Sequence, residues 1–135
     1  MPNETYAREW IDFAYRNLLT AIRLNEVDHF TDIIVIELQQ TIEKLLKALL
    51  AYENRKIPKS HFLDELASLT TMIEFDDREL SLLEKATDYY REDRYPNPRY
   101  TLPTEAETEE LLDFTRTLFE TTCRLTHTSK ERYPL

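Results

Sequence analysis

Apolar residues recur every three or four positions along most of this chain, which is the spacing of one face of an α-helix. The pattern predicts five helical segments, at about residues 4–25, 29–53, 61–73, 77–94 and 105–126. The second segment is apolar nearly all round in its first half, so it is expected to be the central helix of the fold. A polar connector that contains proline separates the second segment from the third, and a second proline-containing connector separates the fourth segment from the fifth.

Residues that favour helix starts support these boundaries. Asp28 is placed to cap the second helix and Ser60 to cap the third. The spacing of a capping box occurs twice, in Asp76 with Glu79 and in Thr104 with Glu107. The last two segments are therefore expected to begin at residues 77 and 105.

The composition narrows the fold class. The chain has no glycine, and glycine normally supplies hairpin turns and the loops that cradle phosphates. Its absence disfavours β folds with many turns and excludes the P-loop and Rossmann fingerprints. An all-α fold is predicted, as one domain over residues 1–135.

The net charge and the number of cysteines indicate which binding partners and which cellular compartment to expect. The net charge of −9 opposes non-specific binding to nucleic acid or to an anionic membrane, so any RNA contact has to be a local patch. No apolar run reaches membrane-spanning length, and no membrane association is expected. A lone cysteine, Cys123, cannot form an internal disulfide, which favours a reducing cytoplasm.

No metal site or cofactor is expected. The three histidines are dispersed, and Cys123 has no second ligand at metal-binding spacing. Glu26 and His29 form a single Glu-x-x-His, whereas a di-iron bundle needs two on facing helices.

The segment Asp88–Tyr100 carries the densest chemistry, with four tyrosines and three arginines in thirteen residues. Arginine beside aromatic rings at a helix end can hold a phosphate and stack on a base. The alternative is structural: Tyr90 packs inward, and Arg94 forms an ion pair with a neighbouring acid.

A polar strip crosses the otherwise apolar second helix. Gln39, Glu43 and Lys47 share one face at four-residue spacing, with Gln40 and Lys44 beside them. One interpretation is a surface ion pair between Glu43 and Lys47, stabilising the helix by about 0.3–0.5 kcal/mol. The other sets the strip opposite Arg94 across a groove that binds a nucleotide or a partner.

Three stretches, taken in order, resemble a known family. They are Gln39–Leu50, Pro58–Leu63 and Tyr90–Pro96, together with Trp10 and Ala14 on the first helix. This combination resembles the HEPN family (higher eukaryotes and prokaryotes nucleotide-binding domain), and in particular its small stand-alone prokaryotic members. The resemblance implies an up-and-down four-helix bundle with a short additional helix, commonly a homodimer. It also implies a small nucleotidyltransferase as a possible partner, in a toxin–antitoxin-like module.

Many HEPN proteins are metal-independent ribonucleases whose motif is an arginine followed, after four to six residues, by a histidine. Here neither Arg91 nor Arg94 is followed by histidine at that spacing. Arg55 and His61 do have the spacing, but they follow the second helix, so the match is interpreted as coincidence. His61 is expected to cap or pack.

We therefore expect a site for a nucleotide, RNA or nucleotidyltransferase partner, with Arg94 as the candidate catalytic cation. Its residues are Tyr90, Arg91, Arg94 and Tyr95 on the fourth helix and Glu43 and Lys47 on the second. An active endoribonuclease is one alternative, although Tyr95 and Tyr100 are poor bases because a phenol has a pKa of about 10. A helical interaction module without a ligand is the other.

An aromatic stripe on the first helix has two interpretations. Tyr6, Trp10 and Phe13 recur at helical spacing. They belong either to the core or to a dimer face.

Overall fold

The computed structural model describes residues 1–92 and 101–135, which contain five α-helices and one 3₁₀ turn joined by loops. The elements are α1 (Glu4–Glu26), α2 (Thr31–Tyr52), α3 (Leu63–Leu69), α4 (Asp77–Glu92), α5 (Glu105–Leu125) and η1 (Lys130–Arg132). No strand occurs in these ranges, which confirms the all-α prediction. None of the helices in the described part of the chain is both long and apolar enough to span a membrane.

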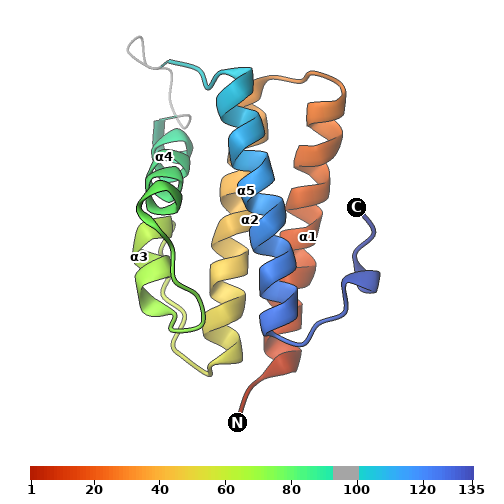
Figure 1. Cartoon of the computed structure of the whole chain (residues 1–135), viewed down its shortest axis with the longest axis vertical. Helices are drawn as coiled ribbons and strands as arrows, with labels where there is room; N and C mark the ends of the chain where they lie inside the picture. The colour runs from red at the N-terminus through yellow and green to blue at the C-terminus, as the bar shows by residue number, and fades with distance from the viewer. Residues whose placement is uncertain (93–100) are drawn as a thin grey trace.

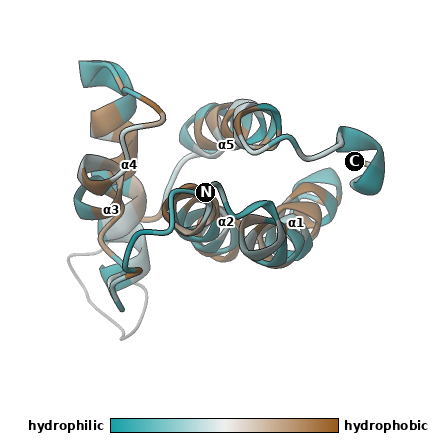
Figure 2. Ribbon diagram, turned by 90° about the horizontal axis from the view of Figure 1, so that it is seen from below, coloured by the Kyte–Doolittle hydropathy of each residue, from teal (hydrophilic) through white to brown (hydrophobic). Residues whose placement is uncertain are grey.

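In chain order, the four long helices α1, α2, α4 and α5 alternate in direction, with α4 inclined to the other three, and α3 lies beside α4 as the short additional helix (Figures 1 and 2). Seen along the bundle, α2 lies between α1 and α5 on one side and the α3–α4 pair on the other (Figure 2). α2 packs against each of the other four helices. The predicted up-and-down four-helix bundle is confirmed.

The central position of α2 follows from its sequence. Its fully buried residues include Leu38, Ile42, Leu45, Leu46 and Leu49, which point in several directions around the helix. A helix that is apolar on all sides is most stable when other helices surround it, because each of its sides is then removed from water. Burial of each leucine stabilises the fold by roughly 1.5–3 kcal/mol.

Both capping boxes form as predicted. The Thr104 hydroxyl accepts a hydrogen bond from the Glu107 amide at 3.0 Å, and the Glu107 carboxylate accepts one from the Thr104 amide at 3.0 Å. Asp76 and Glu79 exchange the equivalent bonds at 2.8 and 3.0 Å. The Thr104 amide, followed by Lys85 and Tyr89, lowers the pKa of Glu107 to about 2.

The two other predicted caps were wrong. Asp28 lies in the turn before α2 with φ of 51°, while Phe30 occupies the cap position without a side-chain bond. Ser60 lies two residues before Phe62, the cap residue of α3, and its hydroxyl accepts from the Phe62 amide in a local turn. α3 also ends at Leu69, before the predicted residue 73, because Thr70 adopts an extended backbone and hydrogen-bonds to Glu53.

The C-terminal residues pack against α1 and α5. Tyr133 is buried, its ring lies 5.2 Å from that of Tyr15 and 5.3 Å from that of Phe119, and its hydroxyl donates to Asp12 at 2.6 Å. Burial and then the bond to Asp12 raise the pKa of Tyr133 to about 12. Tyr15 in turn donates to the Pro134 carbonyl oxygen. Tyr133, in the tail after α5, is therefore part of the core.

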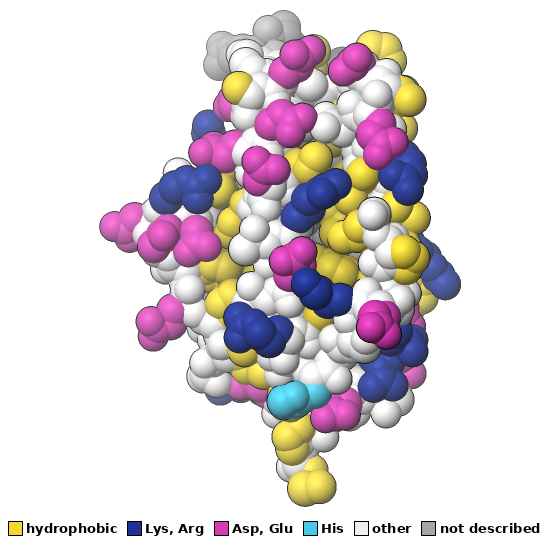
Figure 3. Space-filling model, turned by 45° about the vertical axis from the view of Figure 1, so that its right-hand side comes forward, with side chains coloured by type: hydrophobic (Ala, Val, Ile, Leu, Met, Phe, Trp, Pro, Cys, Tyr) yellow, Lys and Arg dark blue, Asp and Glu magenta, His cyan; other side chains and the backbone are white. Residues whose placement is uncertain are grey.

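The surface on the side of this tail is mixed in charge. Figure 3 shows acidic and basic side chains interspersed over it, with apolar side chains exposed between them. Among the described residues on this face, no extended patch of basic side chains gathers. Because binding to nucleic acid depends on phosphate neutralisation by clustered basic groups, this face does not favour such a ligand.

Candidate functional site

Two charged residues of α2 are buried inside the bundle. Glu43 and Lys47 are only 5% and 6% exposed, and Lys47 Nζ lies 3.0 Å from Glu43 Oε2. The interpretation of this pair as a surface ion pair was wrong. A charge pair so far from water needs further polar partners to offset its desolvation.

His61 supplies one of these partners from the connector between α2 and α3. Its Nδ1 atom lies 2.8 Å from Glu43 Oε1, while half of its side chain remains exposed. Gln39, also buried, donates to the His61 carbonyl oxygen at 3.1 Å and approaches Glu43 Oε1 at 3.4 Å. Both the backbone and the ring of His61 are thus fixed by residues of α2.

The end of α4 contacts the same connector. The Tyr90 ring centroid lies 5.3 Å from that of His61, with the ring planes 43° apart. The guanidinium of Arg91 lies over the ring of Phe62, 5.6 Å from its centroid. Two consecutive residues of the connector therefore meet two consecutive residues of α4. We call Gln39, Glu43, Lys47, His61 and Tyr90 the Glu43 cluster.

Helix α1 closes the other side of the cluster. The ammonium of Lys47 lies 5.7 Å from the centroid of the Trp10 ring. A cation over an indole face is attracted by the ring quadrupole. Trp10 therefore takes part in holding Lys47 in place.

Four of the six residues predicted for the site are described, and the structure links three of them. Glu43 and Lys47 form an ion pair, and His61 connects Glu43 to Tyr90. Arg91 is exposed and lies on Phe62 beside this group. The other two residues, Arg94 and Tyr95, lie outside the described residues. Arg94 is the residue predicted to be the catalytic cation.

His61 is the residue that the sequence analysis missed as a member of this cluster. The signal that could have found it is the polar pair Gln39 and Glu43 on an apolar helix, because buried polar groups need partners. Arg55, at motif spacing from His61, contacts Glu53 and the Leu69 carbonyl oxygen instead. Glu53 is ten residues beyond Glu43, roughly 15 Å along the helix axis, so these contacts hold Arg55 and His61 at different levels of the bundle.

A pocket of about 180 Å³ lies on the α3–α4 side of Phe62 and Arg91. It is lined by Phe62, Asp64, Glu84, Thr87, Asp88 and Arg91. Three carboxylates and one guanidinium give this pocket an acidic balance. The Leu63 amide donates to Thr87 at 3.1 Å and so joins the start of α3 to α4 at the pocket wall.

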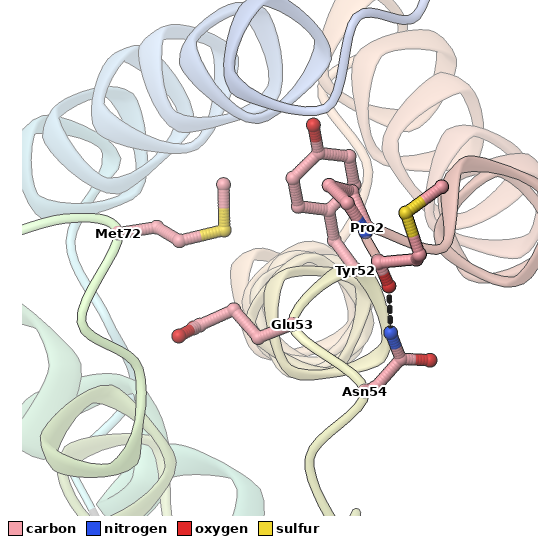
Figure 4. A pocket seen from close by; sticks show the side chains of 6 residues that line it. Pro2, Tyr52, Glu53, Asn54 and Met72 are labelled. Atoms are coloured by element: carbon pink, nitrogen blue, oxygen red, sulfur yellow. Dashed lines mark hydrogen bonds between the residues drawn. The ribbon is translucent and has the colours of Figure 1, made fainter.

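A larger hollow of about 440 Å³ lies at the C-terminal end of α2 (Figure 4). Its lining includes Tyr52, Glu53, Asn54 and Met72, and Asn54 donates a hydrogen bond to the Met1 carbonyl oxygen. The Glu53 carboxylate is already occupied by Thr70, Thr71 and Arg55, which hold the connector after α3. Glu53 and Asn54, two of the polar residues that line this hollow, therefore have structural roles.

The described residues hold no cluster of three or more side chains able to bind a metal ion. Cys123 is buried, and burial raises the pKa of its thiol to about 11. A thiol in this state is a poor nucleophile and a poor metal ligand. The chemistry available in the described site is that of imidazole, carboxylate, ammonium, guanidinium and phenol.

Comparisons with known proteins agree with the fold. A model of the HEPN domain matches residues 7–126. The crystal structure of TT1696 from Thermus thermophilus is similar to the chain, with a TM-score of 0.73 and 23% identity, over 88% of this chain and 97% of that one. At this identity the likeness shows the fold alone. No curated protein matches the chain.

Proposed function

Since the chain belongs to the HEPN domain family, we propose that it binds a nucleotide or RNA at the Glu43 cluster and the adjoining end of α4. Family membership supports a nucleotide- or RNA-related function in general terms. The observation that carries the proposal is the buried ion pair that fixes a half-exposed imidazole against Tyr90, beside the exposed Arg91.

The energetics of the pair favour a functional role. Removing Glu43 and Lys47 from water costs several kcal/mol per ion, and their mutual attraction does little more than offset that cost. Apolar residues at both positions would give a core at least as stable. The pair does, however, orient His61, because the Glu43 carboxylate holds the ring at 2.8 Å.

The groups at the end of α4 suit a nucleotide. Aromatic side chains stack on unpaired bases, and an arginine binds a phosphate through two parallel hydrogen bonds. Tyr90 and His61 supply the rings, and Arg91 supplies the guanidinium. Arg94 and Tyr95 belong to the same proposal on sequence grounds.

Binding of a labelled single-stranded RNA and of ATP, followed by fluorescence anisotropy at several salt concentrations, tests this proposal. Arg91→Ala should weaken binding about tenfold and reduce the salt slope by about one, because one phosphate contact is lost. Arg78→Ala is the matched control, since Arg78 lies at the start of the same helix, exposed and paired with Glu110. Equal affinity in wild type and Arg91→Ala would contradict the site.

The acidic pocket favours a second candidate, docking of a basic protein segment. Asp64, Glu84 and Asp88 line the pocket beside Arg91 and would repel phosphate groups but attract lysine or arginine side chains. A small nucleotidyltransferase, forming a toxin–antitoxin-like module with this chain in the cytoplasm, is the partner we propose. Purification from the native host, with identification of the co-eluting polypeptide, tests this candidate.

We also propose that the chain forms a homodimer through the outer face of α1. Two shallow hollows follow each other along this helix, one lined by Tyr6, Glu9, Trp10 and Phe13 and the other by Arg16, Leu19, Thr20, Arg23 and Leu24. Phe13 is 53% exposed. The acid of the first hollow and the arginines of the second would face each other if two copies of α1 packed antiparallel about a two-fold axis. A second copy of this chain therefore fits the face by charge as well as by apolar surface.

A further inference from the structure

We infer that His61 selects the base of the bound nucleotide or RNA, an inference that rests on the binding proposed above. The selected base carries an exocyclic amino group, as adenine, cytosine and guanine do, whereas uracil, which has none, is disfavoured. The selecting atom is Nε2 of the imidazole. Glu43 is the positioning residue, because the contact on the other ring nitrogen determines whether Nε2 accepts or donates a hydrogen bond.

The Glu43 carboxylate is surrounded by donors. Lys47 donates to its Oε2 at 3.0 Å, and the Gln39 amide approaches its Oε1 at 3.4 Å. The Gln39 contact has a fixed direction, because the amide oxygen of Gln39 accepts from Gln40 at 2.7 Å and its nitrogen is left as the donor. An ionised carboxylate can only accept hydrogen bonds. The contact of 2.8 Å between His61 Nδ1 and Glu43 Oε1 therefore requires a hydrogen on Nδ1.

The other ring nitrogen then has a defined role. In the neutral imidazole with a hydrogen on Nδ1, the lone pair lies on Nε2. Half of the His61 side chain is exposed, and within residues 1–92 and 101–135 no group of the protein forms a hydrogen bond with Nε2. The connector therefore presents an acceptor to the ligand, and the buried carboxylate of Glu43 keeps it in one tautomer and one orientation.

The acidic pocket on the α3–α4 side of Phe62 disfavours carbonyl oxygens as well. Its three carboxylates are those of Asp64, Glu84 and Asp88. The Thr87 hydroxyl in the same lining donates its hydrogen to the Leu83 carbonyl oxygen at 3.0 Å, so only its oxygen is left for a ligand. A carbonyl oxygen of a base would meet charges of its own sign here. Amino hydrogens would be attracted instead.

The edges of the bases differ in the group that they offer to such an acceptor. Adenine N6, cytosine N4 and guanine N2 each carry two hydrogens, whereas uracil offers the oxygen O4 where cytosine has its amino group. An oxygen directed at Nε2 would bring two lone pairs together and leave both without a donor, which costs the desolvation of both groups. The neutral imidazole of His61 therefore favours a base with an amino group.

The rest of the site is compatible with this contact. A hydrogen bond to Nε2 lies in the plane of the imidazole, so the base meets the edge of His61. The face of the base is left to the Tyr90 ring, whose centroid lies 5.3 Å from that of His61. The phosphate remains with Arg91, whose guanidinium lies over Phe62, the residue that follows His61. Base and phosphate thus contact different residues of the seam between the connector and α4.

Two matched pairs of ligands test this selection, at pH 8 to keep imidazole groups neutral. ATP is compared with purine riboside 5′-triphosphate, which lacks only the amino group, by titration calorimetry. A labelled oligo(C) is compared with an oligo(U) of the same length by fluorescence anisotropy. We expect the ligand with the amino group to bind about 3- to 10-fold more tightly in each pair, as for one net hydrogen bond.

His61→Phe separates the hydrogen bond from ring packing. It keeps a ring beside Tyr90 but removes the acceptor, so the preference for ATP should fall below about twofold while the affinity for purine riboside 5′-triphosphate changes little. His29→Phe is the matched control, because His29 is also exposed but lies in the turn between α1 and α2. It should keep the full preference.

Glu43→Gln combined with Lys47→Met tests the positioning role. The glutamine amide can donate to Nδ1, so Nε2 is able to carry the hydrogen and present a donor. The preference for the amino group should then vanish or reverse, which a purely structural role of Glu43 would not cause. The methionine removes the ammonium that would otherwise stay buried without a partner. Circular dichroism reports whether the double variant is folded, and if it is not, His61→Phe alone decides.

Equal affinity of the wild type for both members of each pair would overturn the inference, as would an undiminished preference in His61→Phe. Either result leaves the proposed function intact, because the phosphate contact of Arg91 does not depend on the base. If none of the four ligands binds, the proposed function is refuted together with the selection by His61.

Discussion

His61 Nδ1 lies 2.8 Å from Glu43 Oε1, so a residue on the surface of the bundle is tied to a carboxylate in the middle of its central helix. Glu43 is in turn paired with Lys47, and Lys47 faces Trp10 on α1. This series of contacts runs across the bundle from α1 to the end of α4, where Tyr90 meets the imidazole. A change at any one of these residues is therefore expected to affect its neighbours.

Glu43→Leu alone should destabilise the fold by about 3–5 kcal/mol, because it leaves the ammonium of Lys47 buried without its partner. The double variant Glu43→Leu with Lys47→Leu should regain most of that loss, since apolar side chains suit the surroundings of both positions. Unfolding in urea, followed by circular dichroism, measures both values. A double variant no more stable than the single one would show that the pair contributes through something other than mutual neutralisation.

Phe13→Asp should convert a dimer into a monomer. It places a charge in the apolar hollow on α1, where Phe13 is 53% exposed, so the effect on the isolated fold should be small. We expect the dissociation constant to rise at least about tenfold, as for an apolar anchor in an interface. Size-exclusion chromatography with light scattering is the measurement.

Val27→Asp serves as the control for that variant. Val27 is 72% exposed but lies in the turn after α1, away from both hollows. It should leave the mass of the particle unchanged. A monomeric wild type, or a dimeric Phe13→Asp, would refute the proposed face.

The lowered pKa of Glu107 predicts how the free energy of unfolding changes at acid pH. Its pKa is lowered from the ordinary value of 4.5 to about 2 in the folded state. The folded state therefore favours the charged form, so this contribution is present above about pH 4.5 and is lost as the pH falls toward 2. Glu107→Gln should lower the free energy of unfolding at neutral pH, and the difference from wild type should vanish near pH 2. Urea unfolding at a series of pH values gives this difference, and a constant difference would contradict the prediction.

Asp88→Asn distinguishes the two candidate ligands. Removing one negative charge from the acidic pocket should strengthen RNA binding by up to about fivefold at low salt. It should weaken the docking of a basic protein segment by a similar factor. Anisotropy with RNA and pull-down of the co-eluting partner measure the two effects. Asp113→Asn on α5 is the control, because Asp113 is also exposed but does not line the pocket.

The helices could be predicted from the sequence because each is long and has one strongly apolar face, and the two capping boxes have a fixed local spacing. Asp28 and Ser60 were wrongly predicted as caps because several polar residues near a helix start compete for that position. At Asp28 the chain turns with a positive φ before α2 begins. The local spacing of these polar residues does not show which of them becomes the helix cap, because the path of the chain in the folded protein decides it.

The candidate site could be predicted only in part. The spacing of Glu43 and Lys47 indicates that they pair, but their burial depends on Trp10 and on the α2–α3 connector. His61 is eighteen residues from Glu43, and nothing in the spacing of two such residues predicts a contact. That contact depends on the path of a connector that contains no regular structure between Tyr52 and Leu63.

The packing of Tyr133 between Tyr15 and Phe119 has a consequence for synthesis of the protein. The first helix emerges from the ribosome early, but Tyr133, whose ring covers this part of it, is translated only after all five helices. Until Tyr133 has left the exit tunnel, the nascent chain must leave this apolar surface of Tyr15 open to water or to a chaperone. Completion of the core is therefore expected to be a late step that follows translation of residue 133.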